Sequence, residues 1–297
     1  MQSRAADTRS KPLIIDAHHH LWQRSRGDYD WLDSRNNPAL GPIERDYLVE
    51  DYRPLAAANG IAGSVLVQAA QTEAETRWLL AQAHAANDLV RGVVGWIDMA
   101  APDAADVLEA LAQDRLLRSI RPMLQDIPEL DWVLHPRLAV AFRALIDLDL
   151  SFDLLIRPAH LRSSLTLLTR YPDLRAIIDH CAKPDIAGRS WQPWADGMRH
   201  IAFETNAWCK LSGLVTEASP NWKLDDLRPY VDHVMECFGP QRVVWGSDWP
   251  VMTLSADYGR WLDATKELIS PLSPADQAGI MARNAALLYR MDSDKLD

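Results

Sequence analysis

Short apolar runs alternate with amphipathic segments along most of this chain. The runs are rich in Val, Ile and Leu and are continuous rather than alternating, which is typical of strands covered on both faces. We predict eight strands, at residues 14–20, 61–68, 90–99, 117–123, 151–156, 174–180, 205–213 and 242–249. Helical spacing and capping residues predict helices at residues 47–59, 72–87, 103–114, 136–149, 160–171, 190–203, 224–238, 257–269 and 274–289.

The regular alternation of strands and helices predicts the fold class. The pattern contains no hairpin signal, so the sheet should be parallel, and eight repeats are what a closed (β/α)8 TIM barrel requires. An open doubly wound sheet is the alternative, but no Gly-x-Gly-x-x-Gly motif follows the first strand. We expect a flexible tail at residues 1–12, a single barrel domain at residues 13–297, and a long loop at residues 21–42.

The net charge and the composition argue against several classes of binding partner. The net charge of -10 argues against nucleic acid and against an anionic membrane surface. The three cysteines are scattered, so we expect buried thiols rather than disulfides or a Cys-x-x-Cys zinc site. No apolar run is long enough to span a membrane, and residues 1–12 lack the apolar core of a signal peptide. We therefore expect a cytoplasmic protein, either a monomer or a homodimer.

The first strand runs into a cluster of histidines. Alternate residues of a strand share a face, so His18 and His20 should project together while His19 points the other way. Two adjacent imidazoles at the end of an inner strand can bind a metal ion or polarise a carbonyl group. A histidine-rich turn satisfied by local hydrogen bonds is the alternative, and a lone His-x-His pair is weak evidence against it.

Polar residues also stand at the ends of the other strands, which is where the chemistry of a TIM barrel lies. A buried charge needs a partner or a function. We therefore expect several of these side chains to share one cavity with the histidines. They are Gln68, Asp98, Arg121, Asp153, Arg157, His180, Trp208, Ser212 and Asp248.

Three motifs resemble those of the amidohydrolase superfamily, in particular its amidohydrolase-2 group. They lie at residues 16–20 (Asp-Ala-His-His-His), 178–184 (Ile-Asp-His-Cys-Ala-Lys-Pro) and 245–250 (Trp-Gly-Ser-Asp-Trp-Pro). The resemblance extends from residue 14 to about residue 289. Within the group the chain is most similar to sugar lactonases, of the L-fuconolactonase, L-rhamnonolactonase and galactonolactonase types, and to pyrone dicarboxylate lactonase.

The resemblance implies a hydrolase that opens a sugar lactone to its aldonic acid, with a metal site formed by His18, His20, His180 and Asp248. Binuclear members carry a carboxylated lysine on the fourth strand, where this chain has Arg121. At most one divalent ion, such as Zn²⁺, is therefore expected. The resemblance also implies that lactonases of this branch can work without an obligatory metal.

Lactone hydrolysis needs a base to activate water, an electrophile for the carbonyl and an acid for the leaving alkoxide. We assign both proton transfers to Asp248. We assign polarisation of the carbonyl to His18, His20 and His180, directly or through the ion. The structural alternatives are a helix N-cap for Asp248 and a satisfied core histidine for His180.

Further residues are candidates for holding a polyhydroxylated or anionic substrate. Guanidinium groups suit vicinal hydroxyls and carboxylates, aromatic faces suit a sugar ring, and an ammonium can stabilise an oxyanion. The candidates are Arg121, Arg157, Trp22, Trp31, Gln68, Asp98, Lys183 and Trp208. Alternatively, the arginines form salt bridges with Asp98 or Asp153, the tryptophans only pack, and the lysine is a solvated loop charge.

Two other functions remain open at this point. A Zn-dependent decarboxylase of the same group would require bound metal and release CO₂. A non-catalytic sugar-binding barrel would bind ligand without turnover and would tolerate Asp248→Asn. The set of polar strand ends argues against the second of these.

Overall fold

In the computed structural model, which describes residues 13–291, one parallel sheet is closed into a barrel. Within this range each of eight strands pairs with the next in chain order, and an isolated bridge between His19 and Trp249, in the segment that follows the last strand, brings the two edges of the sheet together. The strands are β1 (Ile14–His19), β2 (Ile61–Val67), β3 (Val90–Gly95), β4 (Leu117–Ile120), β5 (Ser151–Leu154), β6 (Ala176–Ile178), β7 (Trp208–Leu211) and β8 (Val243–Trp245). The predicted TIM barrel is confirmed, and the open doubly wound sheet is excluded.

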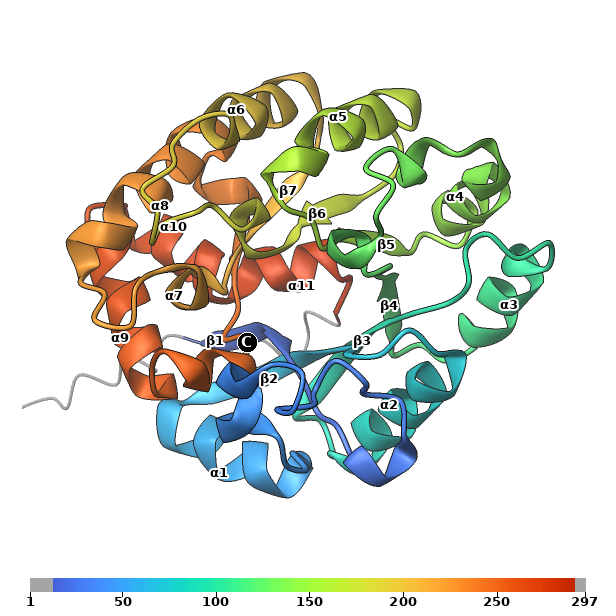
Figure 1. The fold of residues 1–297 in the computed structure, drawn as a ribbon, viewed down its shortest axis with the longest axis horizontal. Coiled ribbons are helices and arrows are strands. Elements are labelled where there is room, and N and C mark those ends of the chain that lie inside the picture. The colour runs from blue at the N-terminus through green and yellow to red at the C-terminus, as the bar shows by residue number, and fades with distance from the viewer. Residues whose placement is uncertain (1–12, 292–297) are drawn as a thin grey trace, which may run out of the picture.

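Helices surround the strands, as Figure 1 shows. The predicted final helix is broken into α10, a π-helical turn (Gly279–Arg283) and α11. No helix among the described residues is long and apolar enough to cross a bilayer. The predicted tail at residues 1–12 lies outside the described residues. The helices are α1 (Val49–Asn59), α2 (Glu73–Ala85), α3 (Ala104–Leu111), α4 (Ala139–Asp147), α5 (Leu161–Arg170), α6 (Trp194–Glu204), α7 (Leu214–Glu217), α8 (Leu224–Phe238), α9 (Tyr258–Leu268), α10 (Pro274–Ala278) and α11 (Asn284–Leu288).

Several strands end earlier than the apolar pattern predicts. The predicted strand at residues 242–249 ends at Trp245, and the one at residues 205–213 ends at Leu211. Beyond these points the backbone enters left-handed conformations, with φ of 61° at Asp248 and 64° at Gly213, which a strand cannot contain. The polar residues that follow the strands therefore lie on short connecting turns rather than in the ladder.

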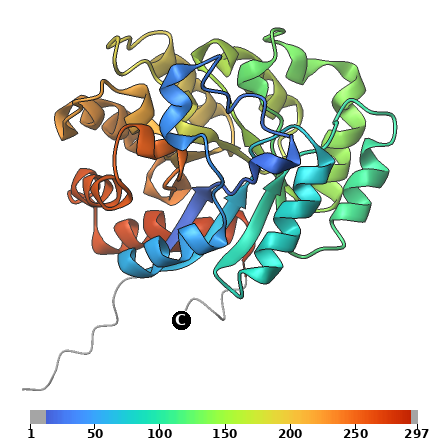
Figure 2. The same ribbon diagram turned by 60° about the horizontal axis from the view of Figure 1, so that its bottom comes forward.

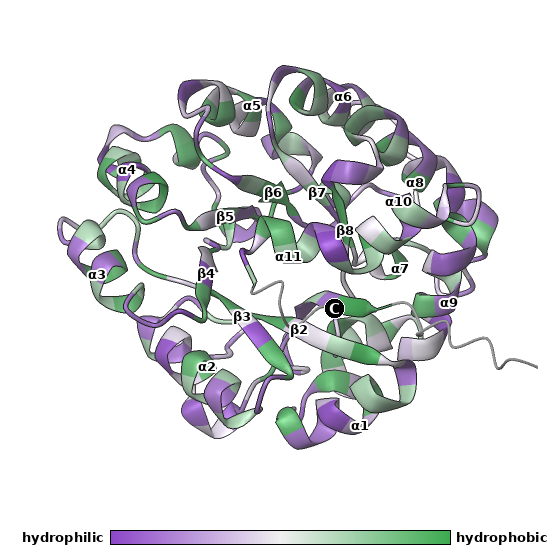
Figure 3. Ribbon diagram, turned by 180° about the vertical axis from the view of Figure 1, so that it is seen from behind, coloured by the Kyte–Doolittle hydropathy of each residue, from purple (hydrophilic) through white to green (hydrophobic). Residues whose placement is uncertain are grey.

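The barrel interior is filled with apolar side chains at its amino-terminal end. Small and branched residues of the strands, such as Ile15, Val65 and Val244, pack against Leu288 and Tyr289 at the end of the chain. Helix α11 lies across the middle of the ring of strands (Figure 1) and is largely apolar (Figure 3). The three cysteines are buried free thiols, as predicted. This packing leaves the carboxyl-terminal end of the barrel for the polar residues.

The long loop after β1 lies over that carboxyl-terminal end. In Figure 2 it is the dark blue segment at the upper side, remote from the end of the chain. Two hydrogen bonds join Trp22 and Tyr47 at its base, and the Trp31 indole donates to the backbone oxygen of Ala69 at 2.7 Å. The loop is therefore fixed to the turn that follows β2.

The start of α2 contains a buried carboxyl group. Thr72 caps the helix by accepting a hydrogen bond from the backbone N–H of Glu75 at 3.0 Å. The Glu75 carboxylate accepts hydrogen bonds from the backbone N–H groups of Ala69 and Ala70 instead of completing the capping box. Burial raises the pKa of Glu75 from 4.5 to about 7. This group therefore takes up a proton more readily in the folded protein than in the unfolded chain.

We expect Glu75 to make stability fall as the pH rises from about 4.5 to about 7. Over that window the unfolded chain loses this proton while the folded protein keeps it, which costs the folded state about 3 kcal/mol by pH 7. Urea unfolding of the wild type and Glu75→Gln at pH 5 and pH 8 should show the variant gaining about 3 kcal/mol relative to the wild type at the higher pH. An equal difference between the two proteins at both pH values would contradict this assignment.

Candidate active site

His18 in β1 and His20, directly after that strand, meet at the carboxyl-terminal end of the barrel. Their Nε2 atoms lie 3.2 Å apart, and both side chains are buried. His19 points to the other face, where its ring stacks on Tyr52 at 3.9 Å between centroids and its Nε2 contacts the hydroxyl of Ser64 at 3.0 Å. The alternation predicted from the strand period is confirmed.

His180 reaches the same place through a left-handed turn after β6. Residues 180–183 have φ values between 50° and 59°, a conformation that costs non-glycine residues about 1–2 kcal/mol each. The turn is held by the indole of Trp194, which donates to the backbone oxygen of Cys181 at 2.7 Å. The His180 ring lies 4.5 Å from that of His18, and its Nδ1 contacts the Ser212 hydroxyl at 2.8 Å. Such strain is typical of functional sites.

Gly213 makes room for this histidine. A β-carbon at Gly213 would lie 2.5 Å from Nδ1 of His180 and 2.7 Å from its Cγ. We expect Gly213→Ala to displace the imidazole and lower kcat/KM about 10- to 100-fold.

Gly60→Ala is the matched control, because Gly60 also has a positive φ (71°) but a β-carbon there meets nothing within 4 Å. Both variants should lose stability in urea unfolding because alanine disfavours a positive φ, and Gly213→Ala should lose more because its β-carbon also overlaps His180. Equal activity of the two variants would show that the space at Gly213 is irrelevant to the site.

Asp248 stands opposite the three histidines. Its Oδ1 lies 3.3 Å from Nε2 of His20, 3.7 Å from Nε2 of His18 and 3.9 Å from Nε2 of His180. Its backbone N–H donates to the carbonyl oxygen of His18 at 2.7 Å, which ties the end of β8 to β1. The four residues predicted as catalytic are thus brought together.

The protonation states of Asp248 and its neighbours suit a general base that faces neutral imidazoles. Burial raises the pKa of Asp248, but His180 and His20 outweigh that effect and hold it below the usual 3.8. Burial lowers the pKa of His180 to about 4. Burial, with the charge of Lys210, also lowers the pKa of His18 well below 6.5. At neutral pH Asp248 is therefore ionised, whereas His18 and His180 are neutral.

A layer of buried charged side chains lies beneath the histidines, and the sequence predicts only part of it. Arg121 donates to Asp179 Oδ2 at 3.1 Å, and Lys210 contacts Asp179 Oδ1 at 2.7 Å and Asp153 Oδ2 at 2.6 Å. Burial raises the pKa of Asp179, but Lys210 and Arg121 overcome it and hold that pKa well below its usual value. The salt bridge anticipated for Arg121 therefore exists, but its partner is Asp179 rather than Asp98 or Asp153.

Asp16 is a further residue that we did not predict for the site. Its Oδ1 accepts from the backbone N–H groups of His18 and Ser247 at 3.2 and 2.8 Å. Its Oδ2 accepts from the hydroxyls of Ser247, Tyr52 and Tyr258 at 2.6–2.9 Å. Asp16 thus fixes the end of β1 against the end of β8 and orients the turns that carry His18 and Asp248.

The predicted substrate-binding residues fall into different environments. Gln68 is buried and donates to the backbone oxygen of Arg121, while its side-chain oxygen has no partner among the described residues. Lys183 lies 3.9 Å from Glu217, and the charges of Asp248 and of the exposed Arg157 both act on it. Gln68, through its contact with Arg121, and Lys183, through the charge of Asp248, therefore adjoin the histidine cluster, whereas Arg157 lies exposed at the surface.

The predicted tryptophans and Asp98 are poorly placed to contact a substrate bound beside the histidines. Trp22 is fully buried, edge-on to Trp31, with its ring centroid 6.3 Å from that of His20. Asp98 is exposed and accepts a hydrogen bond from the backbone N–H of Ala100. Trp208 begins β7 at the amino-terminal end of the barrel, where it packs on the inner apolar cluster. Its position argues against contact with a substrate beside the histidines.

The donor set fits one divalent ion. Within the described residues two buried groups have ligand atoms within 4.8 Å of one another: His18, His20 and Asp248 form one, and His18, Asp179 and His180 form the other. Imidazole and carboxylate donors are those that Zn²⁺ prefers. Arg121 places a guanidinium nitrogen 3.5 Å from Nε2 of His18, and this nearby cation disfavours a second ion.

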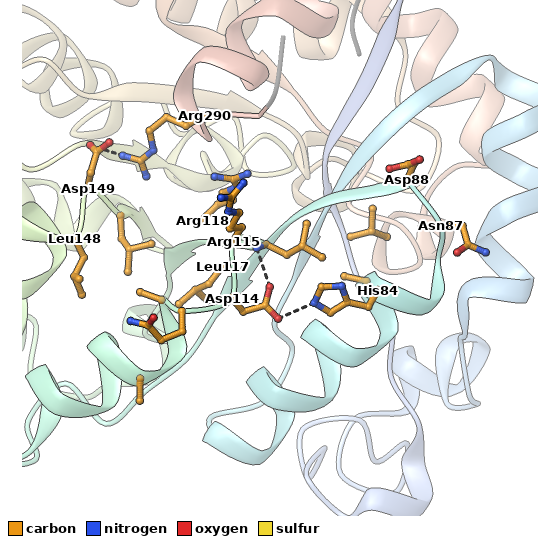
Figure 4. Close-up of a pocket in the computed structure, with 17 residues that line it drawn as sticks. His84, Asn87, Asp88, Asp114, Arg115, Leu117, Arg118, Leu148, Asp149 and Arg290 are labelled. Carbon is orange, nitrogen blue, oxygen red and sulfur yellow. Dashed lines mark hydrogen bonds and ion pairs between the residues drawn. The ribbon is translucent and has the colours of Figure 1, made fainter. Parts of the chain in front are cut away.

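A separate pocket of about 1300 Å³ opens at the amino-terminal ends of β3, β4 and β5 (Figure 4). Asp114 pairs there with His84 at 2.8 Å, and Asp149 pairs with Arg290. It lies at the end of the barrel opposite the histidines, and its charges largely neutralise one another. We therefore place the candidate active site at the histidine cluster and not in this pocket.

Comparison with known proteins agrees with this geometry. The family model described as amidohydrolase matches residues 15–291. The L-fucono-1,5-lactonase of Burkholderia ambifaria is 42% identical over 282 residues, covering 94% of this chain and 96% of that protein. The L-fucono-1,5-lactonase of Burkholderia multivorans is 32% identical over 301 residues, with the same coverage.

A solved structure gives the same result. The crystal structure of an amidohydrolase from Burkholderia multivorans with bound zinc has a TM-score of 0.87 and 32% identity, and the match covers 94% of this chain and all of that one. The resemblance seen in the three sequence motifs is thus confirmed. This chain belongs to the amidohydrolase family.

Proposed function

We propose that this protein hydrolyses a sugar 1,5-lactone of the L-fucono-1,5-lactone class to the corresponding aldonic acid. The observation that carries the proposal is the ionised Asp248 facing three buried histidines at the carboxyl-terminal end of the barrel. The 42% identity to a lactonase over nearly the whole chain supports this substrate class over the decarboxylation considered above. Ionised and neutral groups matched to proton transfer also favour an enzyme over a non-catalytic sugar-binding barrel.

Asp248 acts first as the base. It removes a proton from a water molecule as the water oxygen attacks the carbonyl carbon of the lactone. Negative charge then develops on the carbonyl oxygen, and His18 and His180 stabilise it by hydrogen bonding from a site shielded from solvent. The bond between the carbonyl carbon and the ring oxygen breaks. Asp248 returns its proton to the ring oxygen, which becomes a hydroxyl group, and the product acid ionises and releases one proton.

The surrounding polar groups hold the hydroxyl groups of the sugar. The unpartnered oxygen of Gln68 accepts a hydrogen bond from one of them. Lys183 and Arg157 bind others. Trp22 and Trp31, which pack edge to face within the loop after β1, lie behind His20 and support it.

A bound divalent ion such as Zn²⁺ would be held by His18, His20 and Asp248, and it would supply a Lewis acid for the carbonyl oxygen. The side chains alone already provide a base and hydrogen-bond donors. Cytoplasmic localisation and a monomeric or homodimeric state remain predictions.

A pH-indicator assay on a panel of aldonolactones tests the proposal. We expect acid release from L-fucono-1,5-lactone and from related lactones that share its ring size and hydroxyl configuration. Lactones of the opposite configuration and the five-membered 1,4-lactones are the comparison substrates that test specificity. Acid release from no lactone on the panel would refute the proposal.

A further inference from the structure

Lys210 is the most deeply placed cation of the site. It is fully buried on β7, and its Nζ lies 2.6 Å from Asp153 Oδ2, 2.7 Å from Asp179 Oδ1 and 3.2 Å from Nδ1 of His18. An ammonium group has three N–H donors and no acceptor. Asp153 accepts from one of them and Asp179 Oδ1 lies at ion-pair distance, which leaves a donor for Nδ1 of His18. Nδ1 of His18 must therefore be the acceptor in this contact.

This contact determines where His18 carries its proton. A neutral imidazole that accepts at Nδ1 bears its hydrogen on Nε2. A hydrogen on Nδ1 would instead face the ammonium hydrogens across 3.2 Å, and Asp179 Oδ1 is too far, at 3.7 Å, to accept it. Arg121 lies farther from Nε2, at 3.5 Å, and already donates to Asp179. The closer cation therefore decides the tautomer.

His20 has the opposite arrangement. Its Nδ1 lies 2.8 Å from the backbone oxygen of Val67. A carbonyl oxygen only accepts, so His20 bears its hydrogen on Nδ1 and, when neutral, presents an unprotonated Nε2. The two Nε2 atoms are 3.2 Å apart. When His20 is neutral, the hydrogen of His18 therefore points toward its lone pair, and Oδ1 of Asp248, 3.7 Å from Nε2 of His18 and 3.3 Å from Nε2 of His20, is a second acceptor beside the same hydrogen.

We propose that Lys210 is a positioning residue that keeps the proton of His18 on Nε2, so that the two histidines of the His-x-His motif have different roles. When substrate binds, its carbonyl oxygen replaces His20 as the acceptor of the Nε2–H of His18, and His20 keeps an unprotonated Nε2. The role toward the carbonyl rests on the proposed function. The assignment of the two tautomers does not.

The same arrangement bears on metal binding. An ion can bind a histidine nitrogen only when that nitrogen has a lone pair. His20 meets this condition, and its hydrogen bond to a backbone oxygen is the usual support for a histidine ligand. His18 does not, because an ion at its Nε2 must displace a proton that Lys210 prevents from moving to Nδ1. Lys210 therefore weakens zinc binding by this site.

Nitrogen NMR of the metal-free wild type tests the tautomers directly. The protein is labelled with ¹⁵N in its histidine side chains and treated with chelator, and two signals are assigned with His18→Gln and His20→Gln. We expect the hydrogen of His18 on Nε2 and that of His20 on Nδ1. A hydrogen on Nδ1 of His18, or an equal mixture of tautomers, would overturn the proposal whatever lactone the protein hydrolyses.

A double variant tests the role of Lys210 itself. Lys210→Met combined with Asp153→Asn removes the cation and one of its carboxylate partners together, which avoids leaving an excess buried charge. We expect the His18 proton to shift toward Nδ1, and zinc affinity in a chelator competition to rise about tenfold. Retention of the wild-type tautomer in this variant would overturn the role of the lysine.

Tyr289→Phe is the matched control. The Tyr289 hydroxyl donates to Asp153 Oδ2 at 2.8 Å, so this variant perturbs the same carboxylate but keeps the contact between Lys210 and His18. Its zinc affinity and its His18 tautomer should equal those of the wild type. The same tenfold gain in this control would show that the effect comes from general loosening of the cluster, and would refute the specific role of the ammonium.

Discussion

Replacing Asp248 by Asn should lower kcat about 10³-fold while KM changes little. The amide has the shape of the carboxylate, so the surroundings of His20 and His180 are kept. It cannot take a proton from water, however, and proton transfer by a positioned group typically contributes 10²- to 10⁴-fold. Because the group acts on the reacting atoms, its loss falls on the transition state rather than on substrate binding.

Initial rates of acid release measure this effect, with Asp114→Asn as the control. Asp114 is paired with His84 at the opposite end of the barrel, and its variant should have wild-type activity. A loss of less than tenfold in Asp248→Asn would mean that another group activates water, and the proton transfers assigned to Asp248 would have to be abandoned.

Replacing Asp16 by Asn should destabilise the fold by about 3 kcal/mol. The carboxylate accepts from two backbone N–H groups and three hydroxyls. An amide has one acceptor oxygen, and its NH₂ group would face donors, among them a backbone N–H that cannot reorient. Each buried donor left without a partner costs about 1–3 kcal/mol.

Urea unfolding measures this change. Asp225→Asn is the control, since Asp225 has a 95% exposed side chain and pairs only loosely with Arg228, at 3.9 Å. Asp225→Asn should change the free energy of unfolding by no more than about 0.5 kcal/mol. Equal stabilities of the two variants would show that the Asp16 contacts do not hold the ends of β1 and β8 together.

The barrel and the four residues at the centre of the site can be predicted from the sequence for physical reasons. Continuous apolar runs are required by strands that helices cover on one side and an inner core on the other. The two-residue period of a strand places His18 and His20 on one face. His180 and Asp248 follow later strands of the same barrel, so their meeting follows from the closure of the sheet.

Other features of the site depend on information that the strand pattern does not contain. The left-handed turn at residues 180–183 has no glycine to signal it. Lys210 interrupts a short apolar strand, which is itself a signal, because a buried ammonium requires buried carboxylates. Its partners lie 57 and 31 positions away, at Asp153 and Asp179, and only the register of β5, β6 and β7 brings them together.

Asp98 and Trp208, the two predicted site residues that lie away from the histidines, are misplaced for the same reason. The predicted third strand extends to residue 99, whereas β3 ends at Gly95, so Asp98 lies in a loop and not at a strand end. The predicted seventh strand begins at residue 205, whereas β7 begins at Trp208, which places that indole at the amino-terminal end. Apolar composition continues past the hydrogen-bonded ladder, and the ends of short strands are therefore the least predictable positions.

The most direct test of the central claim is the rate of acid release from L-fucono-1,5-lactone by the wild-type protein after treatment with a chelator. The account predicts that the metal-free protein retains most of its activity, because Asp248 and the histidines supply the base and the hydrogen-bond donors themselves. Loss of activity on chelation, with recovery on addition of Zn²⁺, would contradict it and would make the histidines obligatory metal ligands.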